Sequence, residues 1–344
     1  MIVKLKDVCI KGTSNIRQKD VNDSGRYPVY GAAGPVGFMN SFQYDEPYVG
    51  VVKDGAGIGR ATYLPSNSSI IGTMQALIPK KNVLPKYLYY AVSSMHLEKY
   101  YSGATIPHIY FKNYKHERFV LVSKKEQEQI IWRFSLLEKM ISNKQQQLLK
   151  LDELIKARFV EMFGDPIINN KNIKKKKLGD ICLLKAGDFT PSKKISPVKT
   201  SINKYPCFGG NGIRGYVDNY THQGNYSLIG RQGALCGNVK FATGKFRNTE
   251  HAILVSPNIE INSRWLFELL NLEKLNRFRS GAAQPGLAVK TLNEIIVPVA
   301  DLNSQNEYAN FVQQVDKSKF ENIVYLNKTL LNKILSQIGD VIRD

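Results

Sequence analysis

The amino-acid sequence contains two copies of one unit. Tyr27-Pro28-Val29-Tyr30-Gly31 recurs 178 positions later as Tyr205-Pro206-Cys207-Phe208-Gly209, and Ser102-Gly103-Ala104 recurs at the same separation as Ser280-Gly281-Ala282. A register kept over this length indicates that a whole unit, a module with its tail, has been duplicated. With 344 residues the chain is also too long for one ordinary hydrophobic core. We therefore expect two similar modules in tandem.

The positive charge is confined to two stretches of the chain. The sequence has 48 Lys and Arg against 29 Asp and Glu, a net charge of +19. Residues 1–120 carry a net +7 and residues 166–300 a net +12, whereas residues 121–165 and 301–344 are close to neutral. Such a field attracts a polyanion, because each Lys or Arg beside a phosphate releases a condensed counterion. We predict that two basic modules bind double-stranded DNA at two half-sites, which differ because the loops of the copies differ.

The composition favours a cytoplasmic globular protein. Hydrophobic residues make up 43% and charged residues 22%, which is typical of folded chains. No apolar run approaches the roughly 20 residues of a membrane-spanning helix, and the start has no cleavage signal, so we expect no membrane association. The cysteines are widely spaced, which favours buried thiols over a zinc or redox framework. They are Cys9, Cys182, Cys207 and Cys236.

Each basic stretch is followed by a segment that predicts a long helix. Residues 124–163 contain neither Gly nor Pro, and Gly164-Asp165-Pro166 is a strong helix terminator. Apolar side chains recur there at alternating spacings of four and three, the heptad pattern of a coiled coil. The second tail, from about Ser304, has a poorer seam that shifts phase by about one residue. If a two-fold axis relates the units, the tails pack antiparallel and set the distance between the modules. The predicted seam residues are Ile130, Phe134, Leu137, Ile141, Leu148, Leu151, Ile155, Met162, Tyr308, Val312, Val315, Phe320, Ile323, Leu330 and Ile334.

Within the modules, short apolar runs alternate with Gly, Pro, Asn and Ser, which predicts short strands and many turns. Tyr48–Val52 and Tyr226–Ile229 are expected strands, and Pro85–Tyr101 and Ser263–Ser280 are the expected helices. Each module should hold a small mixed sheet with one flanking helix. The predicted fold class is therefore α+β: two similar mixed α/β domains, each followed by a long helix, with the two helices in an antiparallel coiled coil. The predicted domains are 1–122, 123–165, 166–301 and 302–344.

Glycine-rich loops beside basic side chains are the candidate DNA contacts. Val52–Tyr63 reads VKDGAGIGRATY, and the corresponding Gly230–Phe241 reads GRQGALCGNVKF. Glycine lets the backbone approach a phosphate or turn sharply, and Arg and Gln can bind guanine and adenine through two hydrogen bonds. The alternative is a set of tight turns with incidental surface charge. The predicted DNA-binding residues are Lys53, Arg60, His108, Tyr110, Lys112, Arg214, Arg231, Gln232, Lys240, Arg247 and Lys290.

The sequence offers no catalytic signature. No Asp or Glu is followed two positions later by Lys, which argues against the common restriction-nuclease core, and the five histidines never have the spacing of local metal ligands. Phe208-Gly209-Gly210-Asn211-Gly212 fits the FxGxG element of methyl-donor binding. The first copy breaks that pattern, however, and the companion (D/N/S)PP(Y/F) element is absent from the sequence. We expect no catalytic residue, no metal and no cofactor in this chain.

The order of these elements resembles the specificity subunit of type I restriction-modification systems. The resemblance lies in the glycine loops, the SGATIP and SGAAQP elements, the Gln at the head of each helix (Gln127, Gln305) and LDELIKARFVEMFGDP at Leu151–Pro166. It covers essentially the full length and implies two target recognition domains, each reading half of a bipartite asymmetric DNA site. It also implies modification subunits, expected to be two, that bind the coiled coil and methylate adenine with S-adenosylmethionine. A separate restriction subunit would use ATP.

Two other functions stay open. One is the specificity subunit of a related system whose partner chain fuses the methyltransferase and the nuclease; the other is a stand-alone or architectural DNA-binding protein. An apolar stripe left over after coiled-coil pairing would favour a protein partner, and Ile131, Leu136 and Leu149 lie off the first seam. A catalytic function ranks last, and S-adenosylmethionine binding by the isolated chain would revive it.

Overall fold

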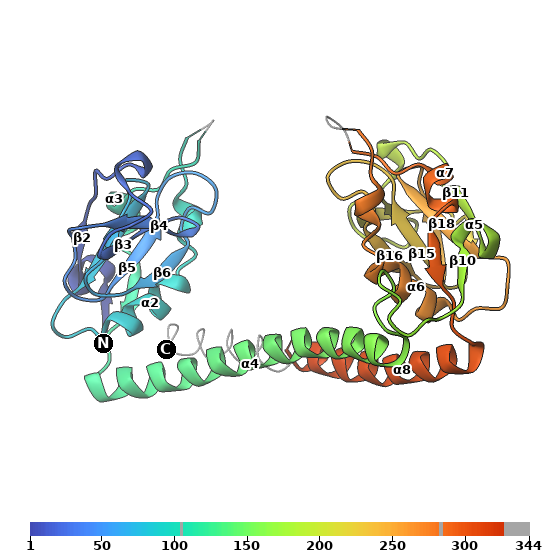
Figure 1. Cartoon of the computed structure of the whole chain (residues 1–344). Coiled ribbons are helices and arrows are strands. Elements are labelled where there is room, and N and C mark those ends of the chain that lie inside the picture. The colour runs from blue at the N-terminus through green and yellow to red at the C-terminus, as the bar shows by residue number, and fades with distance from the viewer. Residues whose placement is uncertain (104–105, 282–284, 327–344) are drawn as a thin grey trace. The chain divides into compact units, whose positions relative to one another are not determined.

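The computed structural model divides into two compact units, each with one module (Figure 1). One unit holds Met1–Gln145 with a segment that begins at Ile323, and the other holds Gln146–Asn322. The structure describes residues 1–103, 106–281 and 285–326. Among these residues, no helix combines the length and the apolar character that a membrane crossing requires.

The first module is built on two small sheets rather than the single sheet expected. One sheet is antiparallel in the order β2-β8-β5-β6; the other has the order β4-β3-β7, with β7 parallel to β3. Strands β1 and β9 form a separate antiparallel pair, and helix α2 packs on β5, β6 and β8. The elements are β1 (Ile2–Lys4), α1 (Leu5–Val8), β2 (Cys9–Gly12), η1 (Gln18–Asp20), β3 (Tyr27–Gly31), β4 (Gly34–Met39), β5 (Tyr48–Val52), β6 (Ala61–Leu64), β7 (Ser69–Ile70), β8 (Met74–Pro79), α2 (Pro85–Ser93), η2 (Leu97–Tyr100), α3 (Phe111–Tyr114) and β9 (Arg118–Val120).

The second module repeats this topology. Its sheets have the orders β11-β18-β15-β16 and β13-β12-β17-β14, again with one parallel pair, β12 with β17. Strands β10 and β19 pair at the same place as β1 and β9 of the first copy. The elements are β10 (Lys175–Lys177), α5 (Leu178–Ile181), β11 (Cys182–Ala186), η3 (Ser192–Lys194), β12 (Tyr205–Gly209), β13 (Gly212–Val217), β14 (His222–Gln223), β15 (Tyr226–Gly230), β16 (Val239–Ala242), β17 (Lys245–Asn248), β18 (Ala252–Pro257), α6 (Ser263–Leu272), η4 (Leu275–Phe278), α7 (Val289–Asn293) and β19 (Ile296–Pro298).

The module helices are shorter than the sequence pattern predicts. Helix α2 ends at Ser93 and α6 at Leu272, and a short 3-10 turn follows each. The chain leaves the helical path because His96 and Lys274 adopt left-handed backbone angles, with φ of 52° and 51°. The apolar pattern nevertheless continues through the turns, since their first leucines are fully buried. Periodicity alone therefore could not separate one long helix from a helix followed by a turn.

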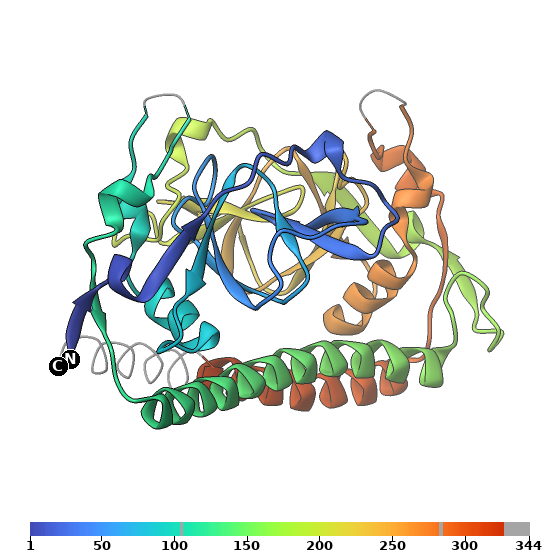
Figure 2. The ribbon, with the colours of Figure 1, turned by 90° about the vertical axis from the view of Figure 1, so that its left-hand side faces the viewer.

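The two long helices pack antiparallel, as predicted. Helix α4 is continuous over Lys124–Phe163, and α8 (Leu302–Tyr325) runs beside its second half in the opposite direction (Figure 2). Asp152 Oδ1 lies 2.5 Å from Lys319 Nζ, and near the end of α4 the Tyr308 hydroxyl donates to the Ile155 carbonyl at 3.2 Å. The predicted seam residues of α4 are all buried or half-buried, as are Tyr308, Val312 and Val315 of α8. Leu330 and Ile334 lie outside the described residues.

The predicted phase shift in α8 is wrong. Phe320 and Ile323, which we expected in the seam, are 67% and 43% exposed. The seam instead continues from Val315 in unbroken steps of four and three, through Lys319 and Asn322, both half-buried. Lys319 serves as a seam residue through its ion pair with α4 rather than through apolar contact. Phe320 follows it by one position, about 100° around the helix, and therefore faces away from the seam.

An aromatic cluster joins the helix pair to the second module. The Phe159 ring of α4 lies 5.4 Å from the Tyr308 ring of α8 and 6.1 Å from Trp265 of α6, between centroids. Phe163, one turn later, contacts the same two rings, each at 5.8 Å. All four side chains are buried in one core that also contains residues of β11, β15 and β18. The helices are therefore part of the core of this unit.

We expect Phe159→Ala to lower the free energy of unfolding of this unit by about 3–5 kcal/mol, because it removes a buried ring and leaves a cavity. The matched control is Phe320→Ala on the neighbouring helix, whose exposed ring should contribute within about 0.5 kcal/mol. Urea unfolding followed by fluorescence measures both, since Trp265 lies in the cluster. Equal effects of the two substitutions would contradict this assignment of the core.

Candidate nucleic-acid interface

In the first module the glycine loop lies beside residues 107–109, which follow the Ser-Gly-Ala element in the sequence. The Ile109 amide donates to the Lys53 carbonyl at 2.8 Å, and the Gly55 amide donates to the Pro107 carbonyl at 2.9 Å. These bonds join segments more than 50 residues apart in the sequence and place the side chains of both on one surface. The predicted residues Lys53 and His108 are thereby brought together.

Some loop glycines are required by packing alone. Gly59 and Gly237 have φ of +83° and +87°, and a Cβ on either would lie 2.4 Å from a backbone nitrogen of the adjacent 3-10 turn. The tight-turn explanation therefore accounts for these two. Gly55 and Gly233 also have positive φ, but a Cβ there would meet no atom within 4 Å. These glycines face open space, which leaves room for a ligand to approach the backbone.

A cluster of polar and aromatic side chains forms at the junction of these loops. His108 Nδ1 lies 2.7 Å from Asp54 Oδ1, and the Lys53 ammonium lies 4.0 Å from the other oxygen of that carboxylate. Tyr110 follows with its ring nearly parallel to His108, and Lys112 Nζ lies 5.5 Å from the centre of the tyrosine ring. Asp54 was not among the predicted residues, yet its carboxylate orients the imidazole and partly neutralises Lys53. The junction can offer hydrogen-bond donors, an acceptor and an exposed phenol.

The remaining predicted residue of this module lies apart from the cluster. Arg60, at the far end of the glycine loop, donates to the Ala32 carbonyl in the β3–β4 turn. Its side chain is exposed, so a ligand could reach the guanidinium from solvent.

The second module keeps the backbone of this junction and changes its side chains. The Leu287 amide donates to the Arg231 carbonyl, and the Gly233 amide to the Pro285 carbonyl, both at 2.8 Å. Gln232 stands where the first copy has Asp54, and Gly286 stands where it has His108. The second junction therefore presents an exposed amide and a guanidinium in place of a carboxylate and an imidazole. Lys290 is exposed on α7 nearby in sequence.

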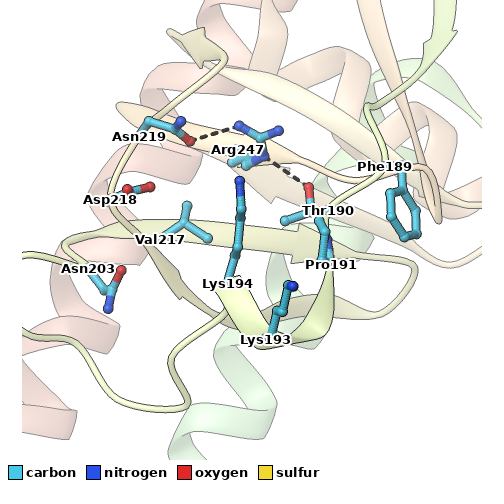
Figure 3. A pocket seen from close by; sticks show the side chains of 10 residues that line it. All are labelled: Phe189, Thr190, Pro191, Lys193, Lys194, Asn203, Val217, Asp218, Asn219 and Arg247. Atoms are coloured by element: carbon cyan, nitrogen blue, oxygen red, sulfur yellow. Dashed lines mark hydrogen bonds between the residues drawn. The ribbon is translucent and has the colours of Figure 1, made fainter.

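The other predicted residues of the second module lie on its second sheet and on β16. Arg214 on β13 donates to the Ser192 hydroxyl at 3.3 Å, and Lys240 on β16 is exposed. Arg247 on β17 donates from Nε to Thr190 Oγ1 at 2.9 Å and from Nη1 to Asn219 Oδ1 at 2.8 Å. It borders a cavity of about 330 Å³ (Figure 3). The contact of the eleven predicted residues with DNA stays a prediction.

Sequence reasoning missed several residues around Arg247. Lys193 and Lys194 of η3 line the same cavity, as do Thr190 and Asn219 (Figure 3). The two adjacent lysines contribute to the positive net charge of residues 166–300, so the sequence alone could have singled them out. Thr190 and Asn219 could not, because only the fold brings them within bonding distance of Arg247.

The cysteines are buried and unbridged. Burial raises the pKa of the Cys9 and Cys182 thiols to about 12, so both are protonated at neutral pH. In the described part of the chain, no group of three or more His, Cys, Asp or Glu side chains is placed to hold a metal ion.

Comparison with known proteins gives a consistent family. The model of the type I restriction modification DNA specificity domain matches residues 1–153 and again 170–335. The chain is 46% identical over 143 residues to the type I restriction enzyme EcoprrI specificity subunit of Escherichia coli, a match covering 42% of this chain and 36% of that subunit. It is 23% identical over 323 residues to a putative type I specificity subunit of Mycoplasma pneumoniae, covering 89% and 86% of the two chains.

Solved structures share the fold. The S subunit of a type I restriction-modification system from M. genitalium superposes with a TM-score of 0.62 at 18% identity, covering 100% of this chain and 96% of that one. A chain from a study of complex assembly in a type I restriction-modification system superposes with a TM-score of 0.59 at 14% identity, covering 99% and 97%. The matched part spans about a third of the length of the first curated relatives, 36% and 30%.

Proposed function

The chain belongs to the type I restriction-modification DNA specificity family, and from that membership we propose that it reads a bipartite, asymmetric DNA site. In this proposal it directs adenine methylation, and restriction, by partner subunits. The main support for the proposal is the pair of junctions, which have the same backbone hydrogen bonds but different side chains. Asp54 and His108 in one copy correspond to Gln232 and Gly286 in the other. Because base edges differ in donors and acceptors, two such surfaces select different bases.

The helix pair supplies the spacing between the half-sites. Helix α4 is continuous over 40 residues, which at about 1.5 Å per residue is roughly 60 Å. The aromatic cluster and the ion pair between Lys319 and Asp152 join it to α8. In this proposal the length of the helix sets the number of base pairs that neither module reads.

Exposed apolar side chains on α4 support a protein partner. Trp132, Leu136, Leu149, Leu154 and Val160 are all more than 40% exposed, although α4 also has a buried seam. At about 100° per residue, Trp132, Leu136 and Leu154 share one side of the helix, and Leu149 and Val160 share another. Exposed apolar side chains of this size are candidates for contact with a protein partner. Of the three off-seam residues singled out from the sequence, Leu136 and Leu149 belong to this set, whereas Ile131 packs against the first module.

We assign this surface to modification subunits, two per chain. S-adenosylmethionine would be bound by these subunits and ATP by a separate restriction subunit, so this chain would carry no cofactor and no catalytic residue. A partner that fuses methyltransferase and nuclease could use the same surface, and the composition of the purified complex distinguishes the two arrangements. The exposed apolar side chains of α4 favour a protein partner over a stand-alone DNA-binding role.

The proposed function is tested by mapping adenine methylation in the host genome with and without this gene. Deletion should abolish methylation at one bipartite, asymmetric motif, which would also reveal both half-sites and the gap. Reintroducing the gene should restore the motif. An unchanged map in a host whose modification subunits are expressed would exclude the methylation-directing role and favour an architectural one.

We expect Arg231→Ala to relax sequence preference in one half-site only, because Arg231 lies in the glycine loop of one module. A lost base contact should reduce discrimination at that base pair by about 1–3 kcal/mol. Lys53→Ala, at the corresponding position of the first module, is the matched variant and should affect the other half-site. If Arg231→Ala instead weakens binding to all sequences equally and lowers the salt dependence, Arg231 contacts a phosphate.

We expect Leu149→Ala to weaken assembly with the modification subunits by about tenfold or more, since a buried leucine contributes about 1.5–3 kcal/mol at an interface. Its effect on the thermal stability of the free chain should be small because the side chain is 64% exposed. Glu153→Ala, an exposed polar position one turn further along α4, is the control. Titration of the chain with purified modification subunit measures both, and equal affinities would argue against this surface.

A further inference from the structure

One cavity of the second module concentrates positive charge. Lys193, Lys194 and Arg247 line it, together with a single acidic residue, Asp218. Figure 3 shows Lys194 extending from η3 toward Arg247, with Lys193 beside it. Three cations against one anion leave the lining with a net positive charge, which attracts a negatively charged group. The cavity is therefore suited to an anion.

Arg247 is held in place before any ligand arrives. Its Nε donates to Thr190 Oγ1 at 2.9 Å and its Nη1 to Asn219 Oδ1 at 2.8 Å. A guanidinium has five N–H groups, and these two bonds use only two of them. Because the side chain is already fixed by the protein, binding a ligand through the remaining donors would cost little further conformational entropy.

The fold does not require Arg247, because the first module has a serine at the matching position. Arg247 pairs with Cys207 in the parallel strand pair, and at the same register of the first copy Ser69 pairs with Val29. Ser69 is only 1% exposed, and its hydroxyl accepts a hydrogen bond from the backbone N–H of Gln43 at 3.0 Å. A buried serine thus performs the structural role at this position, and an arginine is not needed for it.

One of the two lysines of η3 also differs between the copies. The short helices η1 and η3 each precede a bridge to the corresponding strand, from Asn22 in the first copy and from Ser196 in the second. By this correspondence Lys194 stands where the first module has Asp20, which pairs with its own neighbour Arg17 at 3.3 Å. Lys193 corresponds to Lys19, so Arg247 and Lys194 are the two charges of the cavity that the second module has and the first lacks.

We propose that this cavity binds a phosphate group of the DNA backbone beside the second half-site. The proposal rests on the DNA-binding function proposed above and names a contact within it. The planar guanidinium matches two phosphate oxygens, and the lysines act as point charges on the same group. The side-chain amide of Asn203 can donate a further hydrogen bond. Such a contact fixes the position of the module on the duplex and reads no base.

The test is the salt dependence of DNA binding by the complete complex of this chain with its modification subunits. A labelled duplex carrying the mapped motif is titrated between about 50 and 200 mM salt, with wild-type chain and with Lys194→Gln. Loss of one phosphate contact should reduce the slope of log K against log salt by about one and weaken all sequences alike. Lys199→Gln removes the same charge from an exposed position of the same module outside the cavity, and it should leave the slope unchanged.

Ethylation of single phosphates locates the contact. With wild-type chain, ethylation of a phosphate beside the second half-site should block binding, and with Lys194→Gln the same ethylation should have little further effect. Arg247→Lys keeps the charge and loses the two-oxygen geometry, so it should weaken binding while changing the slope less than Lys194→Gln does. An unchanged slope and ethylation pattern in Lys194→Gln would overturn the proposal.

The outcomes separate this inference from the proposed function. If the wild-type complex prefers the motif, and Lys194→Gln has the same salt slope and ethylation pattern as wild type, the cavity does not contact DNA. The specificity role would then still stand. If wild-type complex shows no preference for any bipartite motif, the specificity role itself fails. Adenosine monophosphate is the probe for a free ligand: stabilisation of wild-type chain but not of Lys194→Gln, with an unchanged DNA slope, would assign the cavity to a free nucleotide.

Discussion

A buried glutamine joins each long helix to its module. The side-chain oxygen of Gln127 accepts a hydrogen bond from the backbone N–H of Leu84, just before α2, and its NH₂ group donates to two backbone carbonyls. In the second copy, the side-chain oxygen of Gln305 accepts from the backbone N–H of Asn262, just before α6, and its NH₂ group donates to the Ala300 carbonyl. Both side chains are at most 2% exposed, so an unsatisfied amide there would be costly. The same residue thus makes the same attachment in each copy and fixes how each module meets its own helix. The position of each module's loops relative to its own helix depends on this attachment.

The duplicated chain separates a shared scaffold from a variable surface. Gln127 and Gln305, the packed glycines Gly59 and Gly237, and the strand registers recur in both copies because they satisfy buried groups or avoid backbone collisions. Side chains at the junction on that scaffold differ between the copies, as Asp54 and His108 against Gln232 and Gly286 show. A protein that reads two unlike half-sites needs this combination, since the geometry of approach must be equal while the donors and acceptors must not.

The sequence predicted the features that depend on neighbouring residues. The absence of Gly and Pro marked α4, and the Gly-Asp-Pro terminator marked its end. Phe159 and Phe163 were not predicted as buried, because they lie outside the heptad positions. Both face the second module as well as α8, so a pattern for a two-helix contact alone does not include them. Asp54 and Thr190 were missed because their partners are more than 50 residues away in the sequence. The phase of α8 was misjudged because a lysine stands in its seam and a phenylalanine outside it.

The unequal charge of the modules follows from the same scaffold. At matching positions the first module has the buried Ser69 and the ion-paired Asp20, whereas the second has Arg247 and Lys194. These substitutions leave the backbone pairing unchanged, since both copies keep the parallel strand pair. A phosphate contact of this kind adds affinity without sequence information. In the proposed function the second module would thereby bind DNA more strongly, while the loops of both copies remain free to differ.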